Sequence, residues 1–321
     1  MNRHAWLLIG SMAVSGVALA APPTAEVVQG LYEGTVSGDP GPRKFEARVV
    51  ACGRGTYRIF LRQVGPGDVA TLELEGKADG DVLRFTGKLG NVEWNATFAD
   101  GAIKGTCGPK GRLELKRVQR PSPTLGAKPP AGAVVLLDGK KFDEVTKNPT
   151  SPPWKIVDGD AVEVPKGGMN SKRRFDGSFR LHVEFKCPLI HDARDQGRAN
   201  SGVYLPNGDE IQVLDSFGMT TYKGGGCGGI YAYKDPDTFD KFSLASAPPL
   251  QWQTFDVEYH VPKKDGKVVG KPRVTVSHNG IKIHDNFEVQ REARPGGFHF
   301  QDNGNPVQYR NIWVLPLDGK P

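Results

Sequence analysis

The stretch NSGVYLPNGDEIQVLDS, residues 200–216, decides the fold of the second half of the chain. Residues 202–205 have the pattern of a short strand. Residues 206–209, PNGD, are typical of a turn, because Asn-Gly tolerates the positive φ that a tight hairpin needs. Residues 210–215 then predict a return strand, so the stretch as a whole predicts a β-hairpin.

The return strand carries an acid and an amide on one face. Side chains alternate along a strand, so Ile211 and Val213 are expected in a core, with Glu210 and Gln212 on the opposite face. An acid beside an amide on a rigid sheet is one way to build a sugar-binding or catalytic face. Any half-buried antiparallel strand has the same alternation, and the pattern alone favours this second interpretation.

Alternating strands separated by turn signals occur throughout the chain, and no long helical period is evident. In residues 26–118 they recur at nearly even spacing, which predicts a small antiparallel β meander or barrel. Residues 119–132, QRPSPTLGAKPPAG, predict a semi-stiff linker with few contacts. Residues 133–318 are expected to form two antiparallel sheets packed face to face. The predicted fold class is therefore all-β, with two domains.

The composition of the 321-residue chain fits this fold class. The 41 Gly and 25 Pro residues show no fixed period, which indicates a turn-rich β protein and excludes collagen-like structure. The formal net charge is +6, but basic and acidic residues are interleaved. No nucleic-acid-binding stripe is therefore expected.

The first residues have the features of a secretory signal. Arg3 and His4 precede an apolar run at residues 6–17, and small residues follow up to Ala20. The sequence thus predicts a signal peptide at residues 1–20 and an exported protein, periplasmic or extracellular. The apolar run is too short to span a bilayer and no other segment is long enough, so no transmembrane segment is expected.

Four cysteines in an exported chain favour disulfides. Pairing within each half of the chain predicts Cys52–Cys107 and Cys187–Cys227. The sequence has no CxxC pair and no HExxH motif, so a zinc site is not indicated. No cofactor is predicted. The spacing of the carboxylates neither supports nor excludes a divalent cation such as calcium.

An ordered set of motifs in the second half resembles a known family. The motifs are LLDG at 136–139, NSG at 200–202, EIQVLD at 210–215, GGIY at 228–231, HNG at 278–280 and QDNGNPVQYRNIW at 301–313. Together they resemble the 3-keto-disaccharide hydrolase domain family over residues 134–317. The resemblance implies a concanavalin A-like jelly-roll sandwich and a carbohydrate ligand, a disaccharide or other glycoside. Two positions depart from the family pattern: Asn303 stands where His is usual, and Gln253 follows Trp252 where Asn is usual.

The family name implies cleavage of glycosides whose sugar carries a ketone at C3. Removal of the acidified C2 proton expels the C1 substituent, and water then adds. This chemistry needs a base near C2, an acid near the glycosidic oxygen and donors to the enolate oxygen. Glu210 is the candidate base or acid. Glu184, on a strand expected to run through the same sheet, is the second carboxylate. The candidate substrate-binding residues are His182, Asn200, Gln212, Tyr231, Gln301 and Arg310.

Each candidate also has a structural interpretation. Glu184 with its cationic neighbours Arg180 and Lys186 is typical of a surface ion-pair ladder, and Arg310 is placed to tie the last strand to a neighbour. Whether the protein is an enzyme therefore stays open at this point. The alternatives are a non-catalytic carbohydrate-binding module and a structural envelope protein on the same sandwich.

Overall fold

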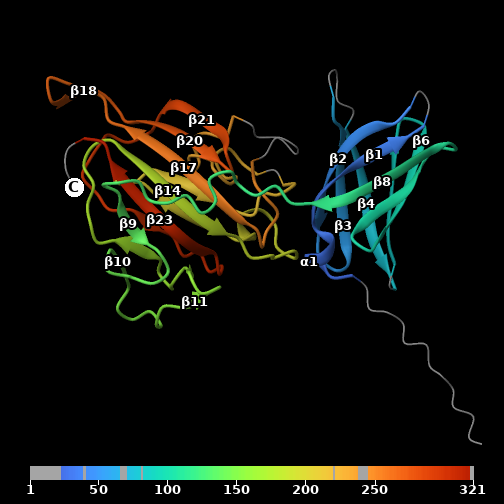
Figure 1. The fold of residues 1–321 in the computed structure, drawn as a ribbon, viewed down its shortest axis with the longest axis horizontal. Helices are drawn as coiled ribbons and strands as arrows, with labels where there is room; N and C mark the ends of the chain where they lie inside the picture. Colours follow the sequence, from blue (N-terminus) through green and yellow to red (C-terminus); the bar gives the residue numbers. More distant parts are fainter. Residues whose placement is uncertain are drawn as a thin grey trace, which may run out of the picture.

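The computed structural model describes residues 23–38, 41–65, 71–80, 82–219, 221–237 and 245–318. It contains a β-barrel and a β-sandwich side by side, joined by the segment that follows strand β8 (Gly111–Val118) (Figure 1). The helical elements among these residues are a short helix, α1 (Ala25–Val28), and a 3-10 turn, η1 (Asp195–Gly197). No helix in the described ranges is long and apolar enough to cross a membrane. The expected signal peptide, residues 1–20, lies outside the described residues.

The first unit is a closed barrel of eight antiparallel strands, in which β1 pairs with both β2 and β8. Alternate side chains along each strand fill the interior, and Tyr32, Ile59 and Phe85 are completely buried there. The predicted small barrel is confirmed. Its strands are β1 (Gly30–Ser37), β2 (Arg43–Ala51), β3 (Thr56–Gln63), β4 (Thr71–Asp79), β5 (Val82–Leu89), β6 (Val92–Ala99), β7 (Ala102–Cys107) and β8 (Gly111–Val118).

The second unit is the predicted sandwich of two antiparallel sheets. The five-stranded sheet has the order β10-β13-β22-β15-β16 and comprises β10 (Val145–Lys147), β13 (Met169–Ser171), β15 (Ser201–Tyr204), β16 (Glu210–Val213) and β22 (His299–Phe300). The eight-stranded sheet has the order β11-β12-β23-β14-β17-β20-β21, with β9 also paired to β23. Its strands are β9 (Val134–Leu137), β11 (Ile156–Val157), β12 (Ala161–Glu163), β14 (Phe179–Lys186), β17 (Trp252–His260), β20 (Arg273–His278), β21 (Ile281–Glu288) and β23 (Gln308–Pro316). A small hairpin, β18 (Lys263–Lys264) with β19 (Lys267–Val268), extends from β17.

The two sheets bury an apolar core between them, in agreement with the alternation in the sequence. Ile211 and Val213 of β16 lie in this core with no exposed surface, as predicted. One polar link crosses the core: the hydroxyls of Ser201 and Tyr309 lie 2.7 Å apart, and the Ser201 hydroxyl also donates to the carbonyl of Gln301. The hairpin β15–β16 has the predicted turn, in which Gly208 adopts a φ of 91°.

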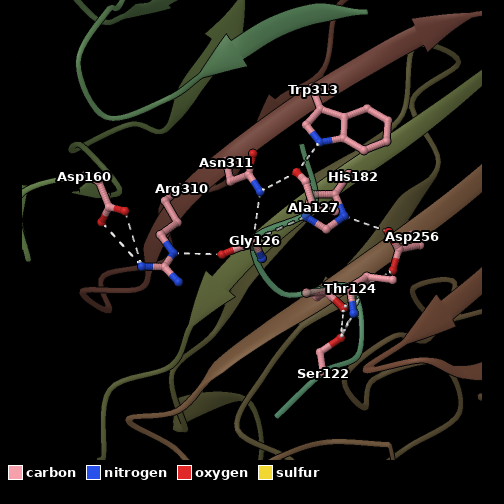
Figure 2. Close-up of polar contacts among 12 residues, drawn as sticks. Ser122, Thr124, Gly126, Ala127, Asp160, His182, Asp256, Arg310, Asn311 and Trp313 are labelled. Carbon is pink, nitrogen blue, oxygen red and sulfur yellow. Dashed lines mark hydrogen bonds and ion pairs between the residues drawn. The ribbon is translucent and has the colours of Figure 1, made fainter. Parts of the chain in front are cut away.

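The segment between the two units does not behave as the sequence suggests. Residues 122–127, here called the strap, lie along the outer face of the eight-stranded sheet (Figure 2). Ser122 and Thr124 share hydrogen bonds of 2.6 and 3.0 Å with Thr254, and the carbonyl of Ala127 accepts one of 3.2 Å from the indole of Trp313. The expectation of few contacts is therefore wrong. The Pro-rich composition correctly indicates that the segment is not a strand. It does not predict that Ser122 and Thr124 form hydrogen bonds with the sheet beneath.

The four cysteines are free thiols, so the expected Cys52–Cys107 and Cys187–Cys227 disulfides are not present in the structure. Cys187 and Cys227 pack inside the sandwich core, where a thiol behaves as a small hydrophobic group. Burial raises the pKa of Cys227 to about 12, which disfavours the reactive thiolate.

A buried ion pair holds the chain on either side of the β15–β16 hairpin. Nη2 of Arg198 lies 2.6 Å from Oδ2 of Asp215, and each side chain is only 1% exposed. The backbone reinforces this link, because the amide of Asp215 donates to the carbonyl of Arg198. Asp215 also accepts a hydrogen bond from the amide of Phe217, which makes it a hydrogen-bond acceptor at the end of the strand.

Breaking this ion pair from one side leaves a buried charge without its partner. We expect Arg198→Met to lower the free energy of unfolding by roughly 3–5 kcal/mol, measured by urea denaturation. The double variant Arg198→Met/Asp215→Leu removes both charges and should recover much of that loss. Equal stabilities for Arg198→Met and the parent protein would show that the pair does not hold these segments.

Candidate functional site

Four polar side chains form a row across the outer face of the five-stranded sheet. Asn170 of β13 is paired with His299 of β22, His299 with Tyr204 of β15, and Tyr204 with Glu210 of β16. Their sequence neighbours Met169, Phe300, Val203 and Ile211 all point into the core. Because alternate residues face opposite sides of a sheet, the four polar side chains share one face.

Contacts between neighbours hold the row in order. The ring nitrogen Nδ1 of His299 lies 2.9 Å from Oδ1 of Asn170, and the rings of His299 and Tyr204 lie 5.4 Å apart. The hydroxyl of Tyr204 accepts a 3.2 Å hydrogen bond from Nε2 of Gln301, and Tyr204 lies directly opposite Glu210 in the pairing of β15 with β16. The row is thus a continuous polar network that ends at a carboxyl group.

The carboxyl group of Glu210 has a pKa close to neutral pH. Its side chain faces outward but is only 7% exposed. Burial raises its pKa to about 7, although the hydrogen bond from Tyr204 opposes the shift. The carboxyl lies over Gly202, where a Cβ atom would be 2.0 Å from Oε1 of Glu210. Residue 202 must therefore lack a side chain for the carboxyl to take this place.

A glycine-rich loop, residues 224–231, covers the free edge of β16. The amide of Tyr231 donates a 3.0 Å hydrogen bond to the carbonyl of Glu210, which places Tyr231 next to the carboxyl along the backbone. Tyr231 is 40% exposed, and its hydroxyl lies 2.8 Å from that of Tyr222. Gly228 adopts a φ of 81°, a conformation that favours glycine. The two tyrosines form an aromatic rim beside Glu210, of the kind that stacks on sugar rings.

Amide side chains complete the surroundings of Glu210. The side-chain amide of Gln212 lies between Oε1 of Gln196, at 2.6 Å, and Oε1 of Glu210, at 3.2 Å, and in a given orientation its NH2 group donates to one of them. Gln196 also accepts a 2.8 Å hydrogen bond from Asn200 and donates one of 2.7 Å to the carbonyl of Gly225. These amides offer donors and acceptors at fixed positions, which suits recognition of sugar hydroxyls.

The structure brings together five of the residues that the sequence singled out. They are Asn200, Glu210, Gln212, Tyr231 and Gln301. It places the other three, His182, Glu184 and Arg310, in the eight-stranded sheet. The expectation that Glu184 and Glu210 share a sheet is wrong, because β14 belongs to one sheet and β16 to the other. Alternation shows which face of its own strand a side chain takes, but not which sheet the strand joins.

Glu184 lies under the strap. Its carboxyl accepts hydrogen bonds from the amide of Gly126 at 2.5 Å, from Asn311 at 2.8 Å and from Nε of Arg310 at 2.8 Å. Burial alone would raise the pKa of Glu184, but these donors and His182 outweigh it and lower the pKa to about 2. Such a carboxylate is saturated with donors and has neither the basicity nor the access that a general base needs.

His182 is also enclosed by the strap and by β23, as Figure 2 shows. Its Nδ1 lies 2.7 Å from Oδ1 of Asp256, and its ring stacks on Trp313 with centroids 5.2 Å apart. Burial opposes the charged form, but the carboxylates of Asp256 and Glu184 outweigh it and raise the pKa of His182. We call His182, Glu184, Asp256 and Asn311 the clamp. Its geometry suits holding the strap, and its members are not exposed as a surface ladder.

Sequence reasoning missed four residues of the site. They are Asn170, Gln196, Tyr204 and His299. Alternation in GFHFQ at 297–301 does show that His299 and Gln301 share a face. Nothing local reveals that β22 lies between β13 and β15, because that neighbourhood joins segments that are far apart in the sequence.

No group of three or more His, Cys, Asp or Glu side chains among the described residues is placed to hold a metal ion. In the row, Tyr204 lies between Glu210 and His299. The row therefore offers one carboxyl group with uncharged hydrogen-bonding neighbours. Such a set can exchange a proton and orient a polar ligand.

Comparison with known proteins assigns the second unit to a family. The family model of the 3-keto-alpha-glucoside-1,2-lyase-like domain, the family that the motifs resemble, matches residues 132–315. The chain belongs to this family. A solved structure of a "putative glycosyl hydrolase" from Parabacteroides distasonis ATCC 8503 is similar, with a TM-score of 0.50 and 29% identity. The match covers 58% of this chain and 84% of that chain. A search of curated proteins found no match.

The clamp predicts how the strap responds to mutation. Glu184→Ala removes the acceptor shared by Gly126, Arg310 and Asn311. We therefore expect the free energy of unfolding to fall by roughly 3–5 kcal/mol. Thermolysin should then cut at Leu125 under conditions that leave the parent intact, as mass mapping of fragments would show. Asp158→Asn is the matched control, since Asp158 forms an exposed ion pair with Lys186 on the same strand face. Equal cutting of parent and Glu184→Ala would refute the clamp.

The raised pKa of Glu210 predicts a pH-dependent stability. The native state binds this proton more tightly than the unfolded chain, so the free energy of unfolding should fall as pH rises from about 4.5 to about 7. Glu210→Gln cannot ionise, so above pH 7 it should be more stable than the parent by about 3 kcal/mol. Below about pH 4.5 the difference should vanish. Urea denaturation at both pH values measures this, and a variant less stable than the parent at high pH would contradict it.

Proposed function

We propose that the sandwich cleaves glycosides whose sugar carries a ketone at C3, with Glu210 as the general base. The single observation that carries the proposal is a buried carboxyl with a pKa of about 7, which lies opposite a tyrosine at the end of a polar row. A base is most effective when its pKa lies near the working pH. Membership of the 3-keto-alpha-glucoside-1,2-lyase-like family and the likeness to a glycosyl hydrolase support a glycoside as the substrate.

The reaction would begin with proton transfer to Glu210. The C3 ketone acidifies the proton on C2, and the Glu210 carboxylate removes it to give an enolate. The electron pair then returns through C2 and expels the substituent at C1, leaving a double bond between C1 and C2 conjugated to the ketone. The proton on Glu210 passes to the departing alcohol, directly or through water. Addition of water across the double bond restores the 3-keto sugar.

Tyr204 is placed to stabilise the enolate oxygen. Burial raises the pKa of the Tyr204 phenol, with the nearby Glu210 as a further cause, so the phenol keeps its proton and can donate it. Residues directly opposite each other in an antiparallel pair have Cβ atoms about 5 Å apart, so Tyr204 and Glu210 can reach neighbouring atoms of one sugar ring. A donor aimed at developing negative charge contributes about 3 kcal/mol to comparable reactions.

Other residues of the site would bind the sugar. The rim tyrosines, Tyr222 and Tyr231, can stack on a ring, and the amides of Asn200, Gln212 and Gln301 can bind its hydroxyls. The rim also favours a second function, a carbohydrate-binding module without turnover, because exposed aromatic side chains suffice for sugar binding. The two functions differ in whether Glu210 is needed for anything beyond binding.

Glu210→Gln separates these functions. The variant keeps the shape of the side chain but removes its basicity, so release of monosaccharide from a 3-keto-glucoside, followed by mass spectrometry, should fall by roughly 10²–10⁴-fold. Binding of the same glycoside should largely survive, because the amide still forms hydrogen bonds. In the parent, kcat/KM should rise with pH and level off above about pH 7, as the base loses its proton.

Glu258→Gln is the matched control, since Glu258 lies in an exposed ion pair with Arg180 on the eight-stranded sheet. Its turnover should equal that of the parent. Full activity of Glu210→Gln would end the assignment of Glu210 as the base. Tight binding of the glycoside by the parent protein without any product would support the binding module instead.

A further inference from the structure

Among the described residues, two of the segments at which the barrel contacts the sandwich flank Glu210; a further contact joins Arg48 to the carbonyl of Ser246. One is the loop 191–198, which leads into β15, and the other is residues 215–219, which follow β16. The buried pair Arg198–Asp215 ties the two segments together. The barrel lies outside residues 132–315, the part of the chain that matches the family.

The first segment presses against the turn between β2 and β3. Nη2 of Arg194 donates a 2.5 Å hydrogen bond to the carbonyl of Cys52. Gly53 of the same turn has a φ of 80°, and a Cβ atom there would lie 2.2 Å from Oδ1 of Asp192. The turn and the loop fit closely, and the positive φ of Gly53 favours glycine at this position.

The second segment buries an apolar patch of the barrel. Val50 and Phe60 point away from the barrel interior, yet both are buried, because they pack against Phe217. Gly218 has a φ of 66°, and a Cβ atom there would lie 2.3 Å from Cγ2 of Val50. The guanidinium of Arg48 lies 5.2 Å from the centre of the Phe217 ring and adds a cation–π contact. Two outward apolar residues on a barrel are explained by this contact.

The loop 191–198 is held partly by its own hydrogen bonds, in which Nη1 of Arg194 donates to the carbonyls of His191 and Ala193 at 3.0 and 2.8 Å. Its regular structure is the three-residue turn η1, and Asp195 within it adopts a φ of 45°. Ala199, which follows, has a φ of 53°. Left-handed conformations of residues with a side chain cost roughly 1–2 kcal/mol each and persist only where the surroundings enforce them. The barrel is therefore one of the surfaces that enforce this loop conformation.

The loop presents Gln196 to the candidate site. The amide of Gln196 contacts Asn200, Gln212 and the carbonyl of Gly225, and Gln212 in turn lies 3.2 Å from Oε1 of Glu210. A short series of contacts thus runs from the barrel through the loop and two amides to the carboxyl. It also reaches the glycine-rich loop that carries the rim, through Gly225.

We propose that the barrel is a positioning domain for the candidate site, and that Gln196 is the positioning residue through which it acts. The inference rests on the proposed function where it concerns turnover, but the positions of Gln196 and Glu210 can be measured without substrate. Loss of the barrel contact lets the loop relax, Gln196 withdraws from Gln212, and the surroundings of the Glu210 carboxyl change.

Arg194→Ala and Phe60→Ala in the full chain test this proposal from the two contact segments. We expect faster hydrogen exchange of the amides in residues 191–198 and a shift of the Glu210 pKa, followed by ¹³C NMR of the carboxyl. With a 3-keto-glucoside, kcat/KM should fall by roughly tenfold, with the midpoint of its pH profile displaced in the same direction. Arg194→Lys, which keeps a donor, should recover part of the effect. Arg112→Ala, an exposed arginine elsewhere on the barrel, is the matched control and should behave as the parent.

A double-mutant cycle identifies the route. If the barrel acts through Gln196, adding Arg194→Ala to Gln196→Ala should cost no more than Gln196→Ala alone. Additive effects would overturn the role of Gln196. Unchanged exchange and an unchanged Glu210 pKa in both contact variants would overturn the positioning role of the barrel. Hydrogen exchange and the Glu210 pKa are measured without substrate. A parent protein that fails to cleave the glycoside would therefore contradict the proposed function, whereas these two measurements would still decide the positioning role of the barrel.

Discussion

The buried ion pair between Arg198 and Asp215 is the interaction on which the rest of the site depends. It closes the base of the β15–β16 hairpin: the loop 191–198 that meets the barrel ends at Arg198, and the segment 215–219 begins at Asp215. Two charges that are 1% exposed are stable only as partners. The pair therefore couples three features that are distant in sequence: the carboxyl on β16, the loop with Gln196 and the apolar patch on the barrel.

The two outer faces of the sandwich show how surroundings decide the behaviour of a carboxyl group. Glu210 and Glu184 are both buried, yet the pKa of Glu210 is about 7 and that of Glu184 about 2. The difference lies in the donors, because Glu184 accepts from Asn311, Gly126 and Arg310 and lies beside His182, whereas the groups near Glu210 that can donate are the uncharged Tyr204 and Gln212. The outer face of the eight-stranded sheet carries the clamp that holds the strap, and the outer face of the five-stranded sheet carries the titratable Glu210 on its last strand.

The sequence predicted those features that depend on local periodicity. Alternation and the PNGD turn correctly placed Ile211 in the core and Glu210 outside it, and the evenly spaced strands correctly predicted the barrel. The sequence did not predict which sheet a strand joins, so Glu184 was expected in the wrong sheet. It also did not predict that the strap covers the polar face of β14 and buries His182. The free cysteines show the same limit, since thiol pairing is a matter of distance between strands.

The glycine-rich loop beside β16 has a consequence for how copies of the protein behave in a crowded compartment. β16 is the last strand of its sheet, and a bare edge offers its backbone to any passing strand. The backbone N–H of Gln212 donates to the carbonyl of Gly229, and the backbone carbonyl of Gln212 accepts from the N–H of Gly228. The loop thus closes the hydrogen-bonding edge without adding a strand. The same glycines that bring Tyr231 beside Glu210 protect the sheet against edge-to-edge aggregation.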